Sequence, residues 1–422
     1  MTRPDAADSH GLAGHSRARR VMLYSHDTYG LGHLRRNLRI ARHLLGTAPD
    51  LQIVLVSGSP VAEYFPKPPG LRIVKLPSVR KVGAEQYRPL HSGLDINLVR
   101  RIRTAIMVDL VRRFRPDVLL VDHSPAGMNG ELLDVFAAVK DHSPATRVAL
   151  GLRDILDDPD TVVRLWTEQA TYSLLAGVYD HIVVYGSRDV FDVGLQYRLP
   201  AAVADRLVYA GYVAPGGRSD GSRGRLLPPA DPYLLATAGG GGDGVATLAA
   251  AIEAGASLGM ATQVIAGPLI DDEAFDFLLD RAQQRDGVDV VKFHPRLHSA
   301  MAEASAIVTM GGYNSLCEAI SVGTPTVVVP RSQPRLEQTI RADIFAARGL
   351  VSVVPAGPDL GARLARAVLE AVVKPAAGRP LDLGGLDRLG SLLLAGAQGL
   401  PNGAAEAGKG PEPERLAERL PA

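Results

Sequence analysis

Short runs of apolar residues alternate with longer amphipathic segments along most of the chain. The runs are apolar on both faces, which is typical of parallel strands covered by helices on both sides. In the first half, we expect strands at 20–25, 51–58, 71–77, 117–122, 147–152 and 181–186. Helical spacing predicts helices at 33–47, 95–114, 128–141, 160–178 and 188–196. This alternation predicts a parallel α/β sheet.

The same alternation restarts after 214–232, a segment dense in Gly, Ser, Pro and charge that we interpret as a linker. Strands are expected at 233–238, 261–267, 288–293, 306–310, 325–330 and 350–355. Helices are expected at 244–257, 271–284, 297–303, 314–322, 336–347 and 359–373. The predicted organisation is therefore a disordered leader (1–19), two Rossmann-like domains (20–213 and 233–400) and a disordered tail (401–422). Such a pair of domains usually holds a ligand in the cleft between the carboxyl ends of its two sheets.

Composition narrows the class of protein only slightly. The net charge of the 422 residues is +1, which gives no reason to expect a nucleic-acid partner. A single cysteine, Cys317, rules out an intrachain disulfide and suits a cytoplasmic setting. No signal peptide is visible, and no run of about 18 apolar residues predicts a membrane-spanning helix.

Glycine-rich corners follow the first strand of each half. In "YSHDTYGLGHLRR" (24–36), Gly30 and Gly32 precede a helix that begins near His33. In "GGGGDG", the glycines at 240–242 can form a nest of backbone N–H groups for a diphosphate. Two alternatives stay open: the first corner can be a plain turn, since a third fingerprint glycine is missing, and the second can reflect local composition.

A third corner, within 307–350, joins a strand to a helix through Gly311 and Gly312. We expect the side chain of Asn314 or Ser315 to cap that helix. The turn and the Ser315 hydroxyl suit phosphate oxygens, and the carboxylate of Glu318 suits a ribose diol. The alternative is an ordinary capping turn that faces solvent.

The segment 307–350 resembles the donor-binding region of GT-B glycosyltransferases, especially family 28. That family has a Gly turn, a glutamate, Gly-x-Pro and a late Gln-Gln pair, which correspond here to Gly311-Gly312, Glu318, Gly323-Thr324-Pro325 and Glu337-Gln338. The resemblance implies a GT-B fold, with two Rossmann-like α/β domains facing each other across a cleft. It assigns Glu318 to the ribose, and Glu337 with Gln338 to the donor sugar. Glu337 departs from the family's glutamine, which leaves the donor sugar open.

The resemblance extends over both halves. "KFHPRLHSAM" is similar to the segment that pairs with the uracil edge, which points to Phe293 and His294. The two earlier glycine corners match the family's loops, so the resemblance assigns a further set of residues to the donor diphosphate: Gly30, Gly32, Gly240, Gly241, Gly242, Gly311, Gly312 and Ser315. The opening also resembles that of uncharacterised bacterial proteins described as predicted glycosyltransferases.

The resemblance implies an inverting, metal-independent hexosyltransferase that uses a UDP-sugar as co-substrate, with no resident cofactor. His33 is the predicted general base, because neutral imidazole accepts a proton near pH 7. Retaining GT-B enzymes have two glutamates eight positions apart, and the position eight before Glu318 is Met310. The acceptor is a hydroxyl compound: a lipid-linked compound, a glycan or a secondary metabolite.

Other enzyme classes compete with this interpretation. "GLGHLRRNLRIA" also resembles the opening of a UDP-sugar hydrolase of pseudaminic acid biosynthesis, in which His33 would activate water. A dry acceptor pocket would distinguish transfer from hydrolysis. A UDP-sugar epimerase is disfavoured because its His-Val-Glu type of motif is absent, and a non-catalytic nucleotide-sugar binding protein is a further alternative.

Three more residues are acceptor-side candidates because they end strands at the expected cleft: Asp122, His123 and Arg153. The Asp-x-Asp at 158–160 could hold a metal in a GT-A enzyme, but Asp158 before Pro159 is more typical of a helix N-cap. The segment 95–115 combines an apolar stripe with six arginines, Arg103 among them. It predicts either a peripheral membrane contact at the inner face of the plasma membrane or, as we favour, an ordinary helix with a basic outer face.

Overall fold

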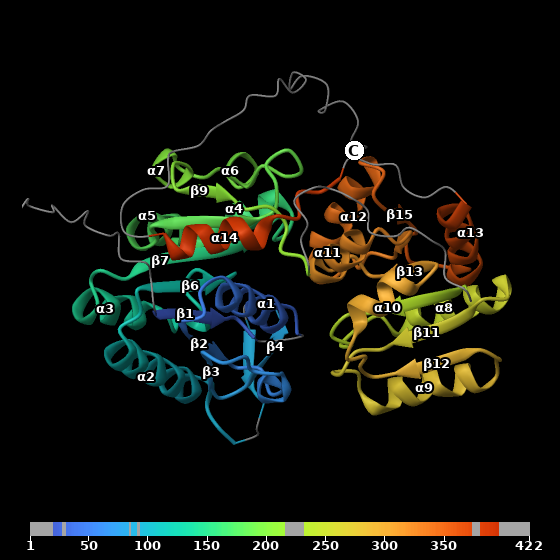
Figure 1. The fold of residues 1–422 in the computed structure, drawn as a ribbon, viewed down its shortest axis with the longest axis horizontal. Coiled ribbons are helices and arrows are strands. Elements are labelled where there is room, and N and C mark those ends of the chain that lie inside the picture. Colours follow the sequence, from blue (N-terminus) through green and yellow to red (C-terminus); the bar gives the residue numbers. More distant parts are fainter. Residues whose placement is uncertain are drawn as a thin grey trace, which may run out of the picture.

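A computed structural model describes residues 20–27, 31–83, 86–90, 93–215, 232–373 and 380–395. The predicted leader and tail, most of the predicted linker and Gly30 lie outside the described residues. The described chain forms two α/β domains side by side, the first coloured blue to green and the second yellow to orange in Figure 1. The predicted fold class is confirmed.

The N-terminal domain contains a seven-stranded parallel sheet in the order β3-β2-β1-β6-β7-β8-β9. Its strands are β1 (Arg20–Ser25), β2 (Gln52–Ser57), β3 (Leu71–Lys75), β6 (Val118–Asp122), β7 (Arg147–Arg153), β8 (His181–Tyr185) and β9 (Leu207–Tyr209). Its helices are α1 (Gly32–Thr47), α2 (Ile96–Phe114), α3 (Leu133–His142), α4 (Pro159–Glu168), α5 (Thr171–Val178), α6 (Val193–Gln196) and α7 (Ala201–Ala204). A small hairpin of β4 (Val79–Gly83) and β5 (Gln86–Pro89) stands apart from this sheet.

The C-terminal domain contains a six-stranded parallel sheet in the order β12-β11-β10-β13-β14-β15. Its strands are β10 (Tyr233–Thr237), β11 (Ala261–Ile265), β12 (Val288–Val291), β13 (Ala306–Thr309), β14 (Thr326–Val328) and β15 (Ser352–Val353). Its helices are α8 (Val245–Leu258), α9 (Asp272–Gln283), α10 (Leu297–Glu303), α11 (Tyr313–Val322), α12 (Glu337–Ala347) and α13 (Leu360–Val373).

The last described helix, α14 (Gly385–Leu394), lies on the N-terminal domain beside α1 (Figure 1). The sequence analysis assigned this segment to the C-terminal domain. Arg147 of β7 donates hydrogen bonds to the carbonyls of Leu392 (3.2 Å) and Leu393 (2.8 Å) at the end of α14. The apolar residues of α14 pack in the hydrophobic core of the first domain, so the chain returns to the N-terminal domain after α13.

A continuous apolar cluster joins the two domains. Tyr212, which follows β9, stacks on Tyr313 of α11 with ring centroids 6.0 Å apart. Tyr212 also meets the edge of Phe345 of α12 at 5.9 Å. Because α11 and α12 begin at the carboxyl ends of their strands, this packing brings the carboxyl edge of the second sheet against the first domain.

Candidate functional site

A hydrogen-bonded His–Asp pair lies at the carboxyl edge of the first sheet. His33 is near the start of α1, and its Nδ1 is 2.6 Å from Oδ2 of Asp122 at the end of β6. Arg36, one turn along α1, binds both oxygens of Asp122 at 2.6 and 2.9 Å. Burial alone would raise the pKa of Asp122, but the charges and hydrogen bonds of Arg36 and His33 outweigh it and hold that pKa well below its usual value. The ionised Asp122 therefore orients His33 and leaves its Nε2 to accept a proton.

Two further histidines surround His33. The ring centroids of His26 and His123 lie 5.9 and 5.1 Å from that of His33. His123 has a φ of 70°, a left-handed conformation that is uncommon for histidine and is enriched at functional sites. Burial, with help from the charge of Arg153, lowers the pKa of His123 well below its usual value. His123 is therefore neutral near pH 7.

The second glycine corner forms a tight loop after β10. Gly241 has a φ of 91°, and a Cβ there would lie 2.8 Å from the backbone of Ala266, Gly267 and Ile270. No other residue type fits that space. Asp243, at the end of the loop, forms an ion pair with Arg331 after β14. The loop is thereby tied to the strand edge that the third corner shares.

The third corner begins α11 without a side-chain cap. Gly312 is the N-cap residue, so the predicted caps Asn314 and Ser315 are wrong. The Asn314 side chain instead donates to the Gly32 carbonyl of the first domain at 2.8 Å. Ser315 is buried beside this junction. The free N–H groups at the start of α11 face the start of α1, where a ligand's anionic group is favoured.

Glu318 is buried in a contact between the domains. Its Oε1 accepts hydrogen bonds from Arg35 at 2.8 Å and from Arg39 at 2.6 Å, both on α1. Its Oε2 is buried and has no hydrogen-bond partner among the described residues. The ion pair was not predicted, because no local pattern links α1 to α11. Because Oε2 has no exposed surface, the structure does not test the predicted ribose contact of Glu318.

Glu337 and Gln338 begin α12 next to the same edge. The backbone N–H of Arg331 donates to Oε1 of Gln338 at 3.3 Å. Arg153, at the end of β7, binds Glu337 at 2.9 Å across the domain boundary. Burial would raise the pKa of Glu337, but Arg153 and the neighbouring arginines lower it overall. An anionic Glu337 is consistent with the arginines clustered around it.

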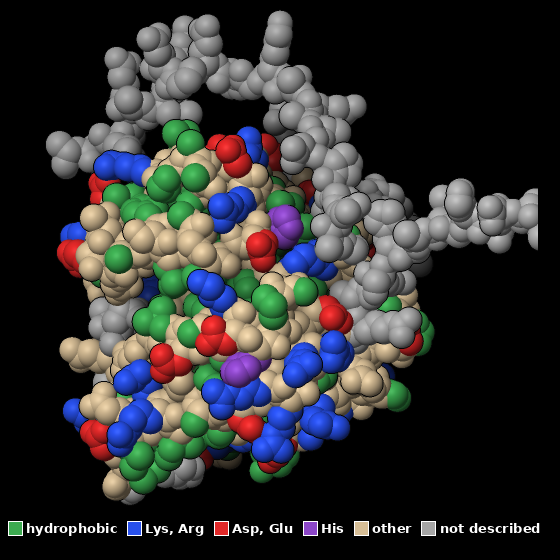
Figure 2. Space-filling view, turned by 90° about the vertical axis from the view of Figure 1, so that its left-hand side faces the viewer, with side chains coloured by type: hydrophobic (Ala, Val, Ile, Leu, Met, Phe, Trp, Pro, Cys, Tyr) green, Lys and Arg blue, Asp and Glu red, His purple; other side chains and the backbone are tan. Residues whose placement is uncertain are grey.

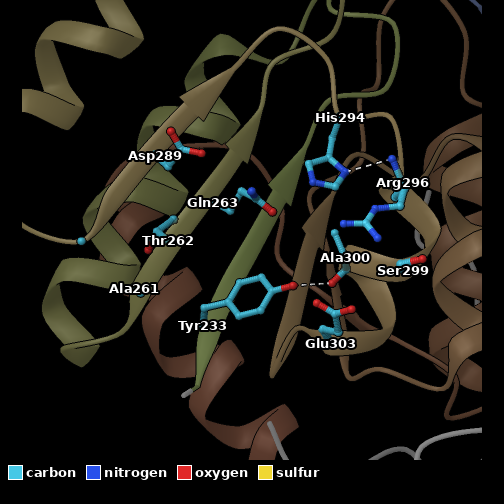
Figure 3. A pocket seen from close by; sticks show the side chains of 11 residues that line it. Tyr233, Ala261, Thr262, Gln263, Asp289, His294, Arg296, Ser299, Ala300 and Glu303 are labelled. Atoms are coloured by element: carbon cyan, nitrogen blue, oxygen red, sulfur yellow. Dashed lines mark hydrogen bonds between the residues drawn. The ribbon is translucent and has the colours of Figure 1, made fainter. Parts of the chain in front are cut away.

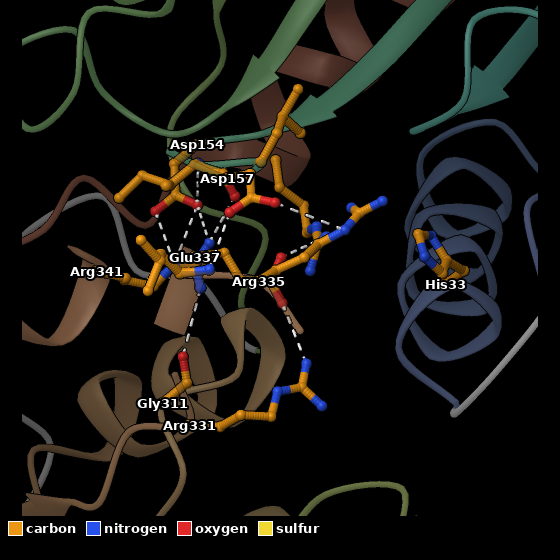
Figure 4. A network of polar contacts seen from close by, with 12 residues as sticks. His33, Asp154, Asp157, Gly311, Arg331, Arg335, Glu337 and Arg341 are labelled. Carbon is orange, nitrogen blue, oxygen red and sulfur yellow. Dashed lines mark hydrogen bonds and ion pairs between the residues drawn. The ribbon is translucent and has the colours of Figure 1, made fainter. Parts of the chain in front are cut away.

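Figure 4 shows how these charges bridge the two domains near α12. Arg341 of α12 donates to Asp154, which follows β7, at 2.8 Å, and to the carbonyl of Gly311 at 3.4 Å. Asp157 accepts from the backbone N–H of Leu336 at 2.9 Å and lies 3.9 Å from Arg335. These contacts between the domains were not predicted, because charged residues far apart in the sequence carry no local pattern that shows which of them pair.

Behind Arg335 lies a small pocket of about 90 Å³ between the strand ends and α4. Its lining combines apolar side chains, among them Leu156, Leu165 and Trp166, with polar ones, among them His26 and His123. Of the predicted acceptor candidates, His123 lines this pocket. Asp122 instead binds His33 and Arg36, and Arg153 binds Glu337. Trp166, which packs against Tyr172 and Tyr197, was not predicted to line a pocket, because a single tryptophan on an amphipathic helix has the same pattern as a core residue.

The predicted nucleoside residues lie at the end of β12. Phe293 is 54% exposed. The His294 side chain lines a separate pocket of about 410 Å³ beside α10, with Tyr233, Gln263 and Asp289 (Figure 3). The backbone at 293–294, which the uracil prediction concerns, lies on the same carboxyl edge of the sheet as the glycine loops. The imidazole of His294 faces away into that other pocket.

The Asp-x-Asp at 158–160 behaves as a helix start. Oδ2 of Asp158 accepts the backbone N–H of Thr161 at 3.0 Å, so the predicted N-cap is confirmed. Within the described ranges, no group of three or more His, Cys, Asp or Glu side chains is arranged to hold a metal ion.

Helix α2 packs against the first domain as an ordinary amphipathic helix, with Val99, Met107 and Val111 buried. Arg103, predicted on its basic outer face, is instead fully buried and paired with Glu131 at 2.6 Å. Among the described helices, none has both the length and the apolar content that a membrane crossing needs.

Comparison with known proteins identifies the second domain. Residues 243–379 match the model of the glycosyltransferase family 28 C-terminal domain. That range contains Ser315, Glu318, Glu337 and Gln338. A search of the curated proteins finds no match.

Solved structures match over most of the chain. The calicheamicin glycosyltransferase CalG4 is 16% identical with a TM-score of 0.55, and the match covers 89% of this chain and 93% of that one. MurG from Acinetobacter baumannii is 13% identical with a TM-score of 0.54, over 89% and 99%. UGT2 from Phytolacca americana, solved with UDP-2fluoro-glucose and pterostilbene, is 16% identical with a TM-score of 0.56, over 89% and 94%. At these identities the likeness shows a shared fold, and that fold is GT-B.

Proposed function

We propose that this GT-B glycosyltransferase with a family 28 C-terminal domain moves a hexose-type sugar from a UDP-sugar to a hydroxyl acceptor, with inversion and without a metal ion. The observation that carries this proposal is the pair of His33 and Asp122, 2.6 Å apart at the edge that faces the donor domain. A UDP-sugar fits the family match and the UDP-2fluoro-glucose bound to the Phytolacca americana enzyme.

In the proposed reaction, the acceptor oxygen attacks the anomeric carbon while its proton passes to Nε2 of His33. The new C–O bond forms as the anomeric C–O bond to the diphosphate breaks, and UDP leaves with the electron pair. Asp122 stabilises the resulting imidazolium. Positive field for the leaving diphosphate comes from Arg331, Arg153 and the N-termini of α8 and α11, so the residues themselves can do what a metal does elsewhere.

The glycine loops and Ser315 would hold the diphosphate, Glu318 the ribose, and Gln338 with Glu337 the sugar. Inversion is supported by Met310, which occupies the position where retaining GT-B enzymes have a second glutamate. Transfer is favoured over the alternative hydrolysis because a pocket with both polar and apolar side chains lies beside His26 and His123, and water needs no such pocket.

We also propose a cytoplasmic location with peripheral membrane contact through α2. Lys and Arg side chains gather on the lower part of the N-terminal domain in Figure 2. Leu98 and Ile102 on α2 are 37% exposed, one turn apart. Basic side chains around exposed apolar ones are what an anionic membrane surface attracts.

A thermal-shift screen with UDP-, GDP- and TDP-sugars tests the donor, since a ligand that binds only the folded state raises its stability. UDP-sugars should raise the melting temperature, and no shift with any nucleotide sugar would remove the donor site. Glu318→Ala should weaken UDP binding about ten-fold. Arg39→Ala, which breaks the same ion pair but keeps the carboxylate, is the matched control; an equal loss in both would show that Glu318 acts only through domain pairing.

A product assay separates transfer from hydrolysis. The wild type should form glycoside in excess over free sugar, and His33→Gln should lose transfer while retaining UDP affinity. Free sugar as the main product in the presence of acceptors would favour the hydrolase.

A further inference from the structure

A buried arginine lies between the His–Asp pair and the second domain. Arg36 is 1% exposed, and its Nη2 donates to both oxygens of Asp122 at 2.6 and 2.9 Å. The same Nη2 lies 3.0 Å from Nδ1 of His33. A nitrogen that donates its hydrogen to Asp122 cannot also accept one from Arg36. The contact therefore places a cation beside the imidazole ring.

This position of Arg36 has an electrostatic consequence for the base. A carboxylate next to a histidine favours the imidazolium, whereas a nearby cation disfavours it. Asp122 alone would therefore favour the protonated ring, which cannot act as a general base. Arg36 opposes this effect in two ways: it takes up the charge of Asp122, and it repels a positive charge on the ring itself.

Aromatic rings from both domains contact Arg36. Its Cζ lies 5.3 Å from the ring centroid of Tyr185 on β8 and 5.7 Å from that of Tyr313 on α11, both within the range of cation–π attraction. Tyr185 lies over Gly151, where a Cβ would collide with the tyrosine hydroxyl. Tyr313 is 3% exposed, and its hydroxyl accepts from the backbone N–H of Val213 at 3.0 Å. The donor domain thus supplies part of the surroundings that fix Arg36.

Resting on the proposed function, we propose that Arg36 is a positioning residue that keeps His33 unprotonated, and that Tyr313 of the donor domain keeps Arg36 in place. Moving the donor domain away removes the Tyr313 ring and allows Arg36 to leave Asp122, so a proton stays on His33. The base therefore becomes able to accept a proton as α11 docks on α1.

Three other titratable side chains face His33. His26 and Asp27 follow β1, and His123 follows β6. Burial raises the pKa of Asp27 and lowers that of His123. These three residues are the same in every variant compared below, so a difference between the variants reports on Arg36 and its surroundings.

NMR of the full-length protein with isotope-labelled histidine follows the protonation of His33 with pH, and the signal missing in His33→Gln assigns it. Arg36→Gln, whose amide can still donate to Asp122 but carries no charge, should raise the protonation midpoint of His33 by about 1–3 pH units. Arg36→Lys restores the charge and should return the midpoint toward that of the wild type. An unchanged midpoint in Arg36→Gln would overturn the proposal.

Arg103→Gln is the matched control, because Arg103 is equally buried and pairs with Glu131 at 2.6 Å, outside the His33 contacts. It should leave the midpoint of His33 unchanged. A shift as large as that of Arg36→Gln would assign the effect to general loosening of the domain and refute the role of Arg36.

A second pair of variants tests the donor domain and decides alone if Arg36→Gln does not fold. Tyr313→Leu removes the ring beside Arg36 and should raise the midpoint of His33, by less than Arg36→Gln does. Tyr313→Phe keeps the ring and should titrate like the wild type. Equal midpoints in Tyr313→Leu and the wild type would overturn the contribution of the donor domain.

The titration uses neither donor nor acceptor, so its failure is distinct from failure of the proposed function. An unchanged midpoint in a protein that forms glycoside refutes the role of Arg36 and leaves the transferase in place. The expected shifts in a protein that forms no glycoside support the role of Arg36 in setting the charge of His33 and refute the proposed function.

Discussion

Asp122→Asn is the sharpest test of the His33 assignment. Asp122 has no exposed surface, and its two oxygens receive His33 and the bidentate Arg36. Asparagine keeps the shape but presents an NH2 group to partners that are themselves donors. The substitution therefore removes the charge that balances an imidazolium and one of the two oxygens that accept from His33 and Arg36.

Two separate costs are expected. Arg36, 1% exposed, loses its counter-ion, and breaking a buried pair costs about 3–5 kcal/mol of unfolding free energy. The loss of general-base orientation should lower kcat by about 10²–10⁴. Glu131→Gln is the matched control, because Glu131 and Arg103 form an equally buried pair, with Arg103 Nε 2.6 Å from Glu131 Oε2, outside the His33 contacts.

Urea unfolding gives the stability of both variants, and UDP release in the presence of the acceptor gives kcat at a temperature where both remain folded. Both variants should lose a similar free energy of unfolding. Only Asp122→Asn should also show the decrease in kcat of about 10²–10⁴, and it should keep its UDP affinity. If Glu131→Gln slows the reaction as much, the effect is one of stability. If Asp122→Asn retains kcat, His33 is not oriented by Asp122 and the proposed mechanism is refuted.

Two further predictions concern stability. Burial lowers the pKa of His123, whereas an unfolded histidine titrates at ~6.5, so the unfolded state binds the extra proton as pH falls and the contribution to stability is lost below about pH 6.5. In urea unfolding between about pH 6.5 and 5, His123→Asn, which tolerates the left-handed φ, should therefore lose less stability with falling pH than the wild type does. An unchanged pH dependence would assign the loss to other groups. Arg341→Met should lower the free energy of unfolding by about 3–5 kcal/mol, because it leaves Asp154 buried and unpaired. The double variant with Asp154→Leu should regain much of that free energy. If it does not, the hydrogen bonds from Arg341 to the backbone contribute more to stability than the ion pair.

The alternation of strands and helices was predictable because parallel strands buried on both faces carry uninterrupted apolar runs, as Val21–Tyr24 of β1 and Val118–Val121 of β6 do. The N-cap of α4 was predictable because Asp158 acts on a backbone three residues away. Such signals are local. The cap of α11 failed for the opposite reason: the Asn314 side chain is drawn to the Gly32 carbonyl of the other domain.

Contacts distant in sequence left no signal. The pairing of Arg341 with Asp154 spans the two domains, and α14 crosses back to the first domain for an apolar surface that only the assembled fold presents. For the site, the glycine corners and Glu318 could be found from a motif, but their partners required the fold.

The stretch "GLGHLRR" joins the two halves of the proposed reaction through helix geometry. His33 and Arg36, three residues apart, share one face of α1 and both contact Asp122. Arg35 and Arg39, four residues apart, share another face and both contact Glu318 of the donor domain. A ribose bound at Glu318 would therefore contact the residue that holds Arg35 and Arg39, and these arginines lie on the same helix as His33. Donor binding and orientation of His33 are therefore expected to be coupled: Glu318→Ala should lower kcat as well as weaken UDP binding, whereas Arg39→Ala, which keeps the carboxylate, should lower kcat and leave UDP affinity close to that of the wild type.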